Sequence, residues 1–265
     1  MTIALLGAGM LGESLLRGLL AAGHPPDAVV VAEKHPPAAN AVRERYAVRV
    51  AGPIEAVAGA EVVLVAVKPP DVPALLGEIG PALAGGTVVV SLAAGVTLAT
   101  LEGALPPGTA VVRVMSNTPV RVREAMSALS AGAHTSEELL ARAERVLAAV
   151  GRTVRVPEAQ QDAVTALSGS GPAYVFLMVE ALIDAGVLLG LPRAVATELV
   201  EQTVYGSAAL LRDSEQSAAA LREGVTSPGG TTIHGLRALD DGGVRAAIYA
   251  AVEAAHRRSR ELGRG

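Results

Sequence analysis

The 265-residue chain contains no cysteine and no tryptophan, and it has only one phenylalanine and four tyrosines. Without cysteine it can form no disulfide, no thiolate nucleophile and no Cys-ligated metal site. Because only 2% of the residues are aromatic, the core has to be built from Ala, Val and Leu. We assign no metal ligands from the sequence.

Positive charge and long apolar runs are scarce as well. The formal net charge is −4, so the basic footprint of a nucleic-acid-binding protein is missing. No apolar run reaches the ~20 residues that a membrane span needs, and the nearest, 173–191, contains Glu180 and Asp184. The first residues enter an apolar run without the basic segment of a signal peptide. We expect a cytoplasmic protein that binds neither nucleic acid nor membrane.

The most informative stretch is residues 3–12, IALLGAGMLG. An apolar run predicts a buried strand, then comes the pattern G-x-G-x-x-G, and residues 11–22 have helical spacing. In such a unit the glycines permit the turn, let a pyrophosphate approach the backbone and let helix and strand pack closely. The helix start also favours a phosphate. The alternative is a glycine-rich turn in another kind of α/β protein. The residues that we assign to dinucleotide binding here are Gly7, Gly9, Met10, Leu11 and Gly12.

A second strand, predicted over 28–32, ends at Glu33 and Lys34. An acidic residue ~20 residues after the glycine motif is where a dinucleotide fold binds the adenosine ribose. We therefore add Glu33 and Lys34 to the cofactor site.

Apolar runs and helical patterns alternate up to residue 156. Strands are predicted over 3–6, 28–32, 48–50, 61–67, 87–91, 110–114, 125–130 and 152–156, and helices over 37–45, 53–58, 71–79 and 136–150. Such continuous apolar strands alternating with helices indicate a parallel, doubly wound, Rossmann-type α/β sheet. Ligands lie beyond the carboxyl ends of such strands, where the sequence has Gly7, Glu33, Lys68, Ala93 and Asn117.

Only helical periodicity follows residue 157. Helices are predicted near 158–167, 172–189, 192–212 and 243–262, with shorter pieces around Gly224. We therefore expect a Rossmann domain over 1–156 and an all-α domain over 157–265. The helix 173–189 is apolar on nearly every face, which is typical of a helix buried in a large core or an interface. We expect it to form a dimer, and the alternative is an ordinary core helix.

Two glycine-rich stretches interrupt the helical half, 167–173 (LSGSGPA) and 225–232 (VTSPGGTT). Each precedes a predicted helix and offers hydroxyl groups and backbone N–H groups that suit a carboxylate or a phosphate. Either alone can be a simple N-cap with a flexible turn. Two of them, attached to a nucleotide-binding fold, favour a substrate site.

Taken together, GAGMLG (7–12), VAVKP (65–69), AAGV (93–96), DAVTALSGSGPAY (162–174) and VTSPGGTT (225–232) resemble the pyrroline-5-carboxylate reductase family over essentially the full length. The resemblance implies NAD(P)H-dependent reduction of 1-pyrroline-5-carboxylate to L-proline, the last step of proline biosynthesis. It also implies a homodimer whose helical domains interleave around an active site at the interface, and in some members a ring of dimers.

The resemblance also implies residue roles. Gly7, Gly9 and Gly12 would bind the pyrophosphate. The residues that would line the track from adenine to nicotinamide are Val67, Lys68, Pro69, Ala93, Ala94 and Gly95, and we add Asn117 at the next strand end. The residues that would hold the substrate carboxylate are Ser227, Gly230, Thr231 and Thr232, with Thr232 nearest the ring nitrogen as the catalytic residue.

Two positions depart from the family pattern. Ser116 stands where bacterial members often have Pro, and Glu33 stands where members that prefer NADPH usually have Ser, Asn or Arg. The choice between NADPH and NADH therefore stays open.

The chemistry needs few side chains, because the cofactor supplies the hydride. If the imine binds already protonated, no strong general acid is required. No lysine follows Lys68, which argues against the lysine-dependent hydroxyacid dehydrogenases, and we interpret His234 as a solvated or capping residue. The alternatives are another two-domain NAD(P)-dependent dehydrogenase acting on a small carboxylate, and a dinucleotide-binding sensor.

Overall fold

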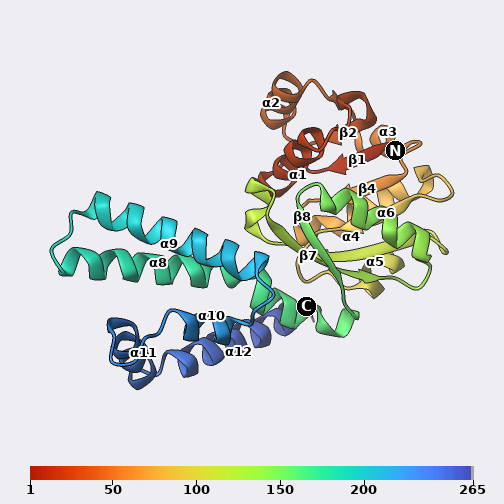
Figure 1. Cartoon of the computed structure of the whole chain (residues 1–265). Helices are drawn as coiled ribbons and strands as arrows, with labels where there is room; N and C mark the ends of the chain where they lie inside the picture. The colour runs from red at the N-terminus through yellow and green to blue at the C-terminus, as the bar shows by residue number, and fades with distance from the viewer. Residues whose placement is uncertain (264–265) are drawn as a thin grey trace. The chain divides into compact units, whose positions relative to one another are not determined.

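The computed structural model describes residues 1–263, and Figure 1 shows its course. The chain divides into two compact units. The first comprises Met1–Ser170 together with the last helical turns from Ala255, and the second comprises Gly171–Ala254.

The first unit contains an eight-stranded sheet with the order β3-β2-β1-β4-β5-β6-β7-β8. Its strands are β1 (Ile3–Leu6), β2 (Val29–Ala32), β3 (Arg49–Val50), β4 (Val62–Val65), β5 (Val88–Ser91), β6 (Ala110–Met115), β7 (Ala125–Ala131) and β8 (Gly151–Arg155). β1 lies between β2 and β4, where Ile3 is opposite Val29 on one side and Val62 on the other. The strands from β3 to β6 are parallel, as the sequence predicts.

The prediction of a wholly parallel sheet is wrong for the last two strands. β7 runs antiparallel to β6, with Met115 opposite Ala128, and β8 runs parallel to β7. The connection 116–124 holds only the short helix η4 (Thr118–Val122) and a left-handed residue, Arg123, with φ 62°. A parallel crossover needs a dozen or more residues, so this connection can only reverse the chain.

Helices cover both faces of the sheet. They are α1 (Met10–Ala21), α2 (Pro36–Tyr46), α3 (Pro53–Val57), α4 (Val72–Ile79), α5 (Leu98–Gly103), α6 (Glu137–Ala148) and α7 (Gln161–Val164). Ser136 caps α6 by accepting a hydrogen bond from the Leu139 N–H. α5 was not expected from the sequence.

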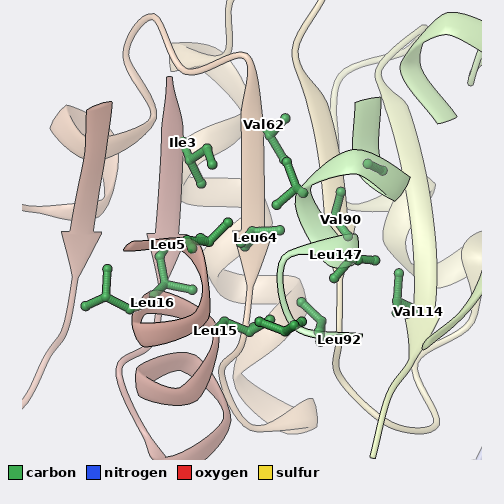
Figure 2. Packing of buried hydrophobic residues seen from close by; sticks show 14 of the residues in the cluster. Ile3, Leu5, Leu15, Leu16, Val62, Leu64, Val90, Leu92, Val114 and Leu147 are labelled. Carbon is green, nitrogen blue, oxygen red and sulfur yellow. The ribbon is translucent and has the colours of Figure 1, made fainter. Parts of the chain in front are cut away.

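The core forms one cluster on each face of the sheet. On one face Leu5 and Leu64 pack with Leu15 of α1 and Leu147 of α6 (Figure 2). On the other face the alternate strand residues, such as Leu6, pack with α4 and α5. Because both faces are covered, every residue of β1 and β4 is buried. This arrangement confirms the doubly wound class. Because both faces of the sheet are covered, a ligand can reach the sheet only at the ends of its strands.

The second unit is entirely helical, as predicted. Its helices are α8 (Gly171–Leu188), α9 (Arg193–Asp213), α10 (Ala218–Gly224), α11 (Thr231–Asp241) and the greater part of α12 (Val244–Leu262). α8 and α9 lie side by side (Figure 1), close enough that a Cβ on Gly186 would lie 3.0 Å from the Cβ of Ala196.

The compact units divide at a different place from the predicted domains, whose boundary was 156/157. β8 does end at Arg155 and only helices follow. However, Gln161 is buried against the sheet, where its Nε2 donates to the Ala128 carbonyl oxygen at 3.2 Å. The hydroxyl of Ser259 in α12 donates to Asp162 at 2.7 Å. These contacts join residues 157–170 and the end of α12 to the first unit.

α8 has no buried residue within the described chain. Phe176 is 65% exposed and Leu177 66% exposed. By length and composition alone the helical stretch Glu158–Leu188 could cross a membrane, although core helices of other proteins pass the same test. The helix therefore presents a large apolar surface that the chain by itself does not cover.

Candidate dinucleotide and substrate sites

The turn between β1 and α1 depends on two glycines for packing and leaves a third in open space. Gly7 has φ +95°, and a Cβ there would lie 2.8 Å from the Ala66 carbonyl oxygen. A Cβ on Gly12 would overlap the carbonyl oxygen of Gly7. By contrast, nothing lies within 4 Å of the place where a Cβ on Gly9 would be. Gly9 is thus not needed for packing, and the space beside it is free for a ligand.

The start of α1 faces this open space. Gly9 is its N-cap and provides no side chain, and the first turn includes Met10, Leu11 and Gly12. The first N–H groups of a helix have no acceptor within the helix, and the helix dipole adds partial positive charge. These groups suit an anion such as a pyrophosphate.

Glu33 fastens the end of β2 to the glycine turn. Its Oε2 accepts a hydrogen bond from the Ala8 N–H at 2.8 Å, and its Oε1 accepts one from the His35 N–H at 2.9 Å. A carboxylate oxygen has two acceptor positions, so Glu33 can still accept a hydrogen bond from a ribose hydroxyl. Sequence reasoning placed Glu33 correctly at the strand end but missed its bond to Ala8.

Lys34 is held by a residue that the sequence analysis did not select. Its Nζ lies 2.9 Å from Oδ2 of Asp71, which ends the short helix η2 (Pro69–Asp71) after β4. This hydrogen bond is the main reason why the pKa of Asp71 lies below its usual value and that of Lys34 above it. Beside them, Lys68 and Pro69 are exposed and Val67 is half-buried. Cγ1 of Val67 would lie 3.0 Å from a Cβ on Gly7.

The loop after β5 lies at the same edge of the sheet. Ala93 is buried, Ala94 is exposed, and Gly95 has φ +79°. A Cβ on Gly95 would lie 3.8 Å from the carbonyl oxygen of Leu262, so the end of α12 packs on this loop.

Asn117 follows β6, and both the nitrogen and the oxygen of its side-chain amide form hydrogen bonds within the protein. Its Nδ2 donates to the carbonyl oxygen of Ser168 at 3.2 Å and to its hydroxyl at 3.3 Å, and its Oδ1 accepts from the Met126 N–H at 2.9 Å. Asn117 thereby ties the start of β7 to the π-helical turn Thr165–Gly169, which contains part of the first glycine-rich stretch. At the neighbouring position, Ser116 accepts a hydrogen bond from the Ser127 hydroxyl at 3.0 Å.

The four predicted substrate residues meet at the start of α11 in the second unit. The Gly230 N–H donates to the Ser227 carbonyl oxygen at 3.1 Å, and a Cβ on Gly230 would overlap Oγ of Ser227. Gly230 is the N-cap of α11 and has no side chain to cap it. Thr231 and Thr232 stand in the first turn, and no group among residues 1–263 hydrogen-bonds to the Thr232 hydroxyl. This helix start suits a carboxylate.

The structure therefore brings the predicted residues together in two groups. Those of the first unit lie at the carboxyl ends of β1, β2, β4, β5 and β6, and those of the second lie at α11. In residues 1–263 no three His, Asp or Glu side chains gather in a way that could hold a metal ion.

Two family descriptions match the chain. "Pyrroline-5-carboxylate reductase dimerisation" matches residues 158–262, and "NADP oxidoreductase coenzyme F420-dependent" matches residues 2–95. The first contains the helices α7 to α12, and the second contains the glycine turn, Glu33 and the loop residues up to Gly95.

Curated relatives and solved structures agree with the first match. The pyrroline-5-carboxylate reductase of Mycobacterium tuberculosis is 44% identical over 283 residues, covering 98% of this chain and 96% of that protein. The Synechocystis protein of the same name is 43% identical, covering 99% and 98%.

Among solved structures, a pyrroline-5-carboxylate reductase from Coxiella burnetii has a TM-score of 0.95 at 36% identity and covers 98% of both chains. The Plasmodium falciparum pyrroline carboxylate reductase, solved with NADP bound, has a TM-score of 0.87 at 28% identity, covering 99% of this chain and 98% of that one. The chain therefore belongs to the pyrroline-5-carboxylate reductase family.

Proposed function

We propose that this protein reduces 1-pyrroline-5-carboxylate to L-proline with NADH or NADPH, the last step of proline biosynthesis. The observation that supports the proposal most is that a chain of this family has two helix starts whose first N–H groups are available to a ligand. One follows the glycine turn in a Rossmann sheet, and the other follows the Ser-Pro-Gly-Gly loop. In functional terms, residues 1–156 bind the dinucleotide, and residues 157–265 bind the substrate and form the dimer.

The first helix start fits a dinucleotide. The space beside Gly9 is open, the first N–H groups of α1 are available, and Glu33 keeps free acceptor positions. When bound there, the cofactor supplies the hydride. The residues that we propose to hold it are Gly7, Gly9, Met10, Leu11, Gly12, Glu33, Lys34, Val67, Lys68, Pro69, Ala93, Ala94, Gly95 and Asn117. Because its amide is already bonded to Ser168 and Met126, Asn117 contributes mainly by shaping the loop.

The second helix start fits the substrate. A small carboxylate can accept hydrogen bonds from the N–H groups and hydroxyls of Ser227, Gly230, Thr231 and Thr232. The Thr232 hydroxyl has no protein partner among the described residues, so it can form a hydrogen bond with the ring nitrogen and fix the orientation of the imine ring. Orientation of this kind lowers the barrier. When the imine binds already protonated, addition of the hydride to its carbon gives the neutral amine, and no proton transfer by the protein is needed.

We also propose a homodimer, which can assemble further into a ring of dimers, located in the cytoplasm. Two observations support the dimer: the helical half matches a dimerisation family, and α8 exposes apolar side chains along its length. This helix also forms the larger part of the stretch Glu158–Leu188, which is long and apolar enough to cross a membrane by length and composition. A partner's helices explain its composition better than lipid does, since Glu180 and Asp184 lie within it.

One assay tests the activity. Absorbance of NADH or NADPH is followed with 1-pyrroline-5-carboxylate, with a small hydroxy acid plus the oxidised cofactor, and without substrate. We expect oxidation of reduced cofactor only with the cyclic imine, together with formation of proline. Turnover of the hydroxy acid instead would identify another dehydrogenase, and cofactor binding without any turnover would identify a sensor.

A further inference from the structure

The ion pair between Lys34 and Asp71 spans the edge of the sheet where the glycine turn begins. Lys34 follows β2 and Asp71 follows β4, and these two strands flank β1 (Figure 1). The pair therefore connects the two segments on either side of the end of β1.

Glu33 makes no hydrogen bond to this lysine. Its two oxygens each accept a hydrogen bond from a backbone N–H group, those of Ala8 and His35, and its charge raises the pKa of Lys34 less than Asp71 does. Asp71, in contrast, is surrounded by positive charge: Lys34 lowers its pKa most, and Lys68 and His35 lower it further. Asp71 thus neutralises basic groups that otherwise stand beside the ribose-binding carboxylate.

We propose that Asp71 is a specificity-determining residue, which disfavours NADPH by engaging the Lys34 ammonium that a 2′-phosphate would otherwise bind. This inference rests on the proposed dinucleotide site, but not on the identity of the substrate. In NADH the ribose 2′-hydroxyl needs no cation, and Asp71 keeps Lys34. In NADPH the phosphate and the Asp71 carboxylate compete for the same ammonium.

Either the 2′-phosphate or the Asp71 carboxylate can bind the Lys34 ammonium. The side chains of Lys34 and Asp71 are 68% and 45% exposed, and exposed ion pairs contribute little to stability. A 2′-phosphate carries about −1.5 to −2 charges near neutrality, so it can draw Lys34 away. The charge of Lys68 then still acts on the Asp71 carboxylate. The preference is therefore graded, and its size depends on the charge of Asp71.

Asp71 can be changed without disturbing the fold. Its carboxylate caps no N–H of α4, and its backbone N–H donates to the Lys68 carbonyl oxygen at 2.9 Å, which a substitution leaves in place. Asp71→Asn removes the charge and preserves the shape. Glu138→Gln is the matched control, because Glu138 is the exposed partner of Arg142 in α6, outside this site.

Binding of two fragments tests the inference without any turnover. The Kd values of adenosine 2′,5′-bisphosphate and of 5′-AMP are measured by titration calorimetry on the full chain, at one fixed salt concentration. The variants are Asp71→Asn, Lys34→Gln, the double variant and Glu138→Gln. Circular dichroism establishes that each is folded.

We expect Asp71→Asn to improve the affinity for the bisphosphate relative to 5′-AMP by about three- to tenfold. Lys34→Gln should reduce the ratio, the double variant should match Lys34→Gln, and Glu138→Gln should match the wild type. An unchanged ratio in Asp71→Asn, or a gain that survives in the double variant, would overturn the inference. So would failure of the wild type to bind either fragment. If the fragments behave as expected but the cyclic imine is not reduced, the proposed function fails and this inference stands.

Discussion

Thr232 is the residue on which the proposed chemistry depends most. Its hydroxyl lies in the first turn of α11 with no hydrogen-bond partner among residues 1–263. We predict that Thr232→Ala lowers kcat by roughly tenfold to a hundredfold, because loss of a positioning contact can have large effects on rate. The Kd of the reduced cofactor, measured by fluorescence titration, should stay within about twofold of the wild type.

Thr232→Ser is the matched control, since it keeps the hydroxyl and removes only the methyl group. Its kcat should lie much closer to the wild type. If Thr232→Ala weakens cofactor binding as much as it lowers kcat, Thr232 serves the cofactor or the fold instead of the substrate.

Glu33 should disfavour NADPH through its charge. A carboxylate beside a 2′-phosphate carries a penalty of about 1–3 kcal/mol after screening. We predict that Glu33→Gln raises kcat/KM for NADPH relative to NADH, by roughly five- to a hundredfold. Glu33→Ser should shift the ratio in the same direction. Steady-state rates with both cofactors on the wild type and both variants give the ratio.

Glu33→Gln and Glu33→Ser distinguish the effect of the carboxylate charge from that of the hydrogen bond that Glu33 accepts from the Ala8 N–H. Gln retains an oxygen that can accept the Ala8 N–H, whereas Ser is too short to bridge to it, so Glu33→Ser should also raise KM for both cofactors. A ratio that does not change in either variant would mean that Glu33 only holds the turn, and that the preference lies with Lys34 and Asp71.

At the scale of elements, the β1–α1 turn contains a glycine needed for packing, Gly12, and another, Gly9, that we propose is needed for binding. We predict that Gly12→Ala lowers the free energy of unfolding by at least about 2 kcal/mol, because its Cβ would overlap the Gly7 carbonyl oxygen. Gly9→Ala should leave stability within about 0.5 kcal/mol, since Gly9 has φ −65° and open space around it. Chemical denaturation measures both.

Gly9→Ala should nevertheless weaken dinucleotide binding, because the added methyl group occupies the space beside the helix start. Titration calorimetry with NADH measures this loss. Undiminished affinity in a folded Gly9→Ala variant would show that the pyrophosphate does not approach the backbone there.

The sequence was most informative about elements with strong local patterns. The strands β1, β2, β4 and β5 are continuous apolar runs, and Ser136 with two glutamates predicts the start of α6. Apolar runs of this kind do not encode strand direction, which is why β7 was assigned the wrong orientation. The connection 116–124 was the available signal, because it is too short for a parallel crossover. α5 is only six residues long, too short for a helical period to stand out.

For the candidate site, the sequence located the strand ends but not the side-chain contacts between them. The bonds from Glu33 to Ala8, from Lys34 to Asp71 and from Asn117 to Ser168 join residues 25, 37 and 51 positions apart. No local pattern marks such pairs. They depend on strand order, which brings separate loops to one edge of the sheet.

At the scale of the whole molecule, the change from strands to helices at residue 156 did not predict how the chain packs. Gln161 lies within the predicted helical half but is buried on the sheet, where Ser130 and Ala128 accept its amide hydrogens. Ser259, close to the C-terminus, returns to bond Asp162. Periodicity reports the type of an element, whereas the unit to which it belongs depends on such distant contacts.

The exposed surface of α8 leads to the last prediction, that the protein is at least a dimer in solution. Phe176, Leu177 and Leu182 are each more than half exposed in the single chain. Burying a large apolar side chain contributes about 1.5–3 kcal/mol, so several on one helix provide a strong drive to associate. Light scattering should give a mass of two chains or a multiple of it. Phe176→Glu should lower the mass toward one chain and reduce activity with it, because the family resemblance implies an active site that is shared between partners.

Ile54→Glu is the control for introducing a charge at an exposed apolar position. Ile54 is 51% exposed on α3 in the first unit, and its substitution should change neither mass nor activity. An active monomer, of the wild type or of Phe176→Glu, would contradict the shared site and would mean that α8 is covered in some other way. A wild-type mass that is a multiple of the dimer, and that falls to the dimer before it falls to the monomer on dilution, would instead extend the assembly to a ring of dimers. A ring of dimers has one interface within each dimer and another between dimers. α8 would then lie in the interface within the dimer, which is the stronger of the two.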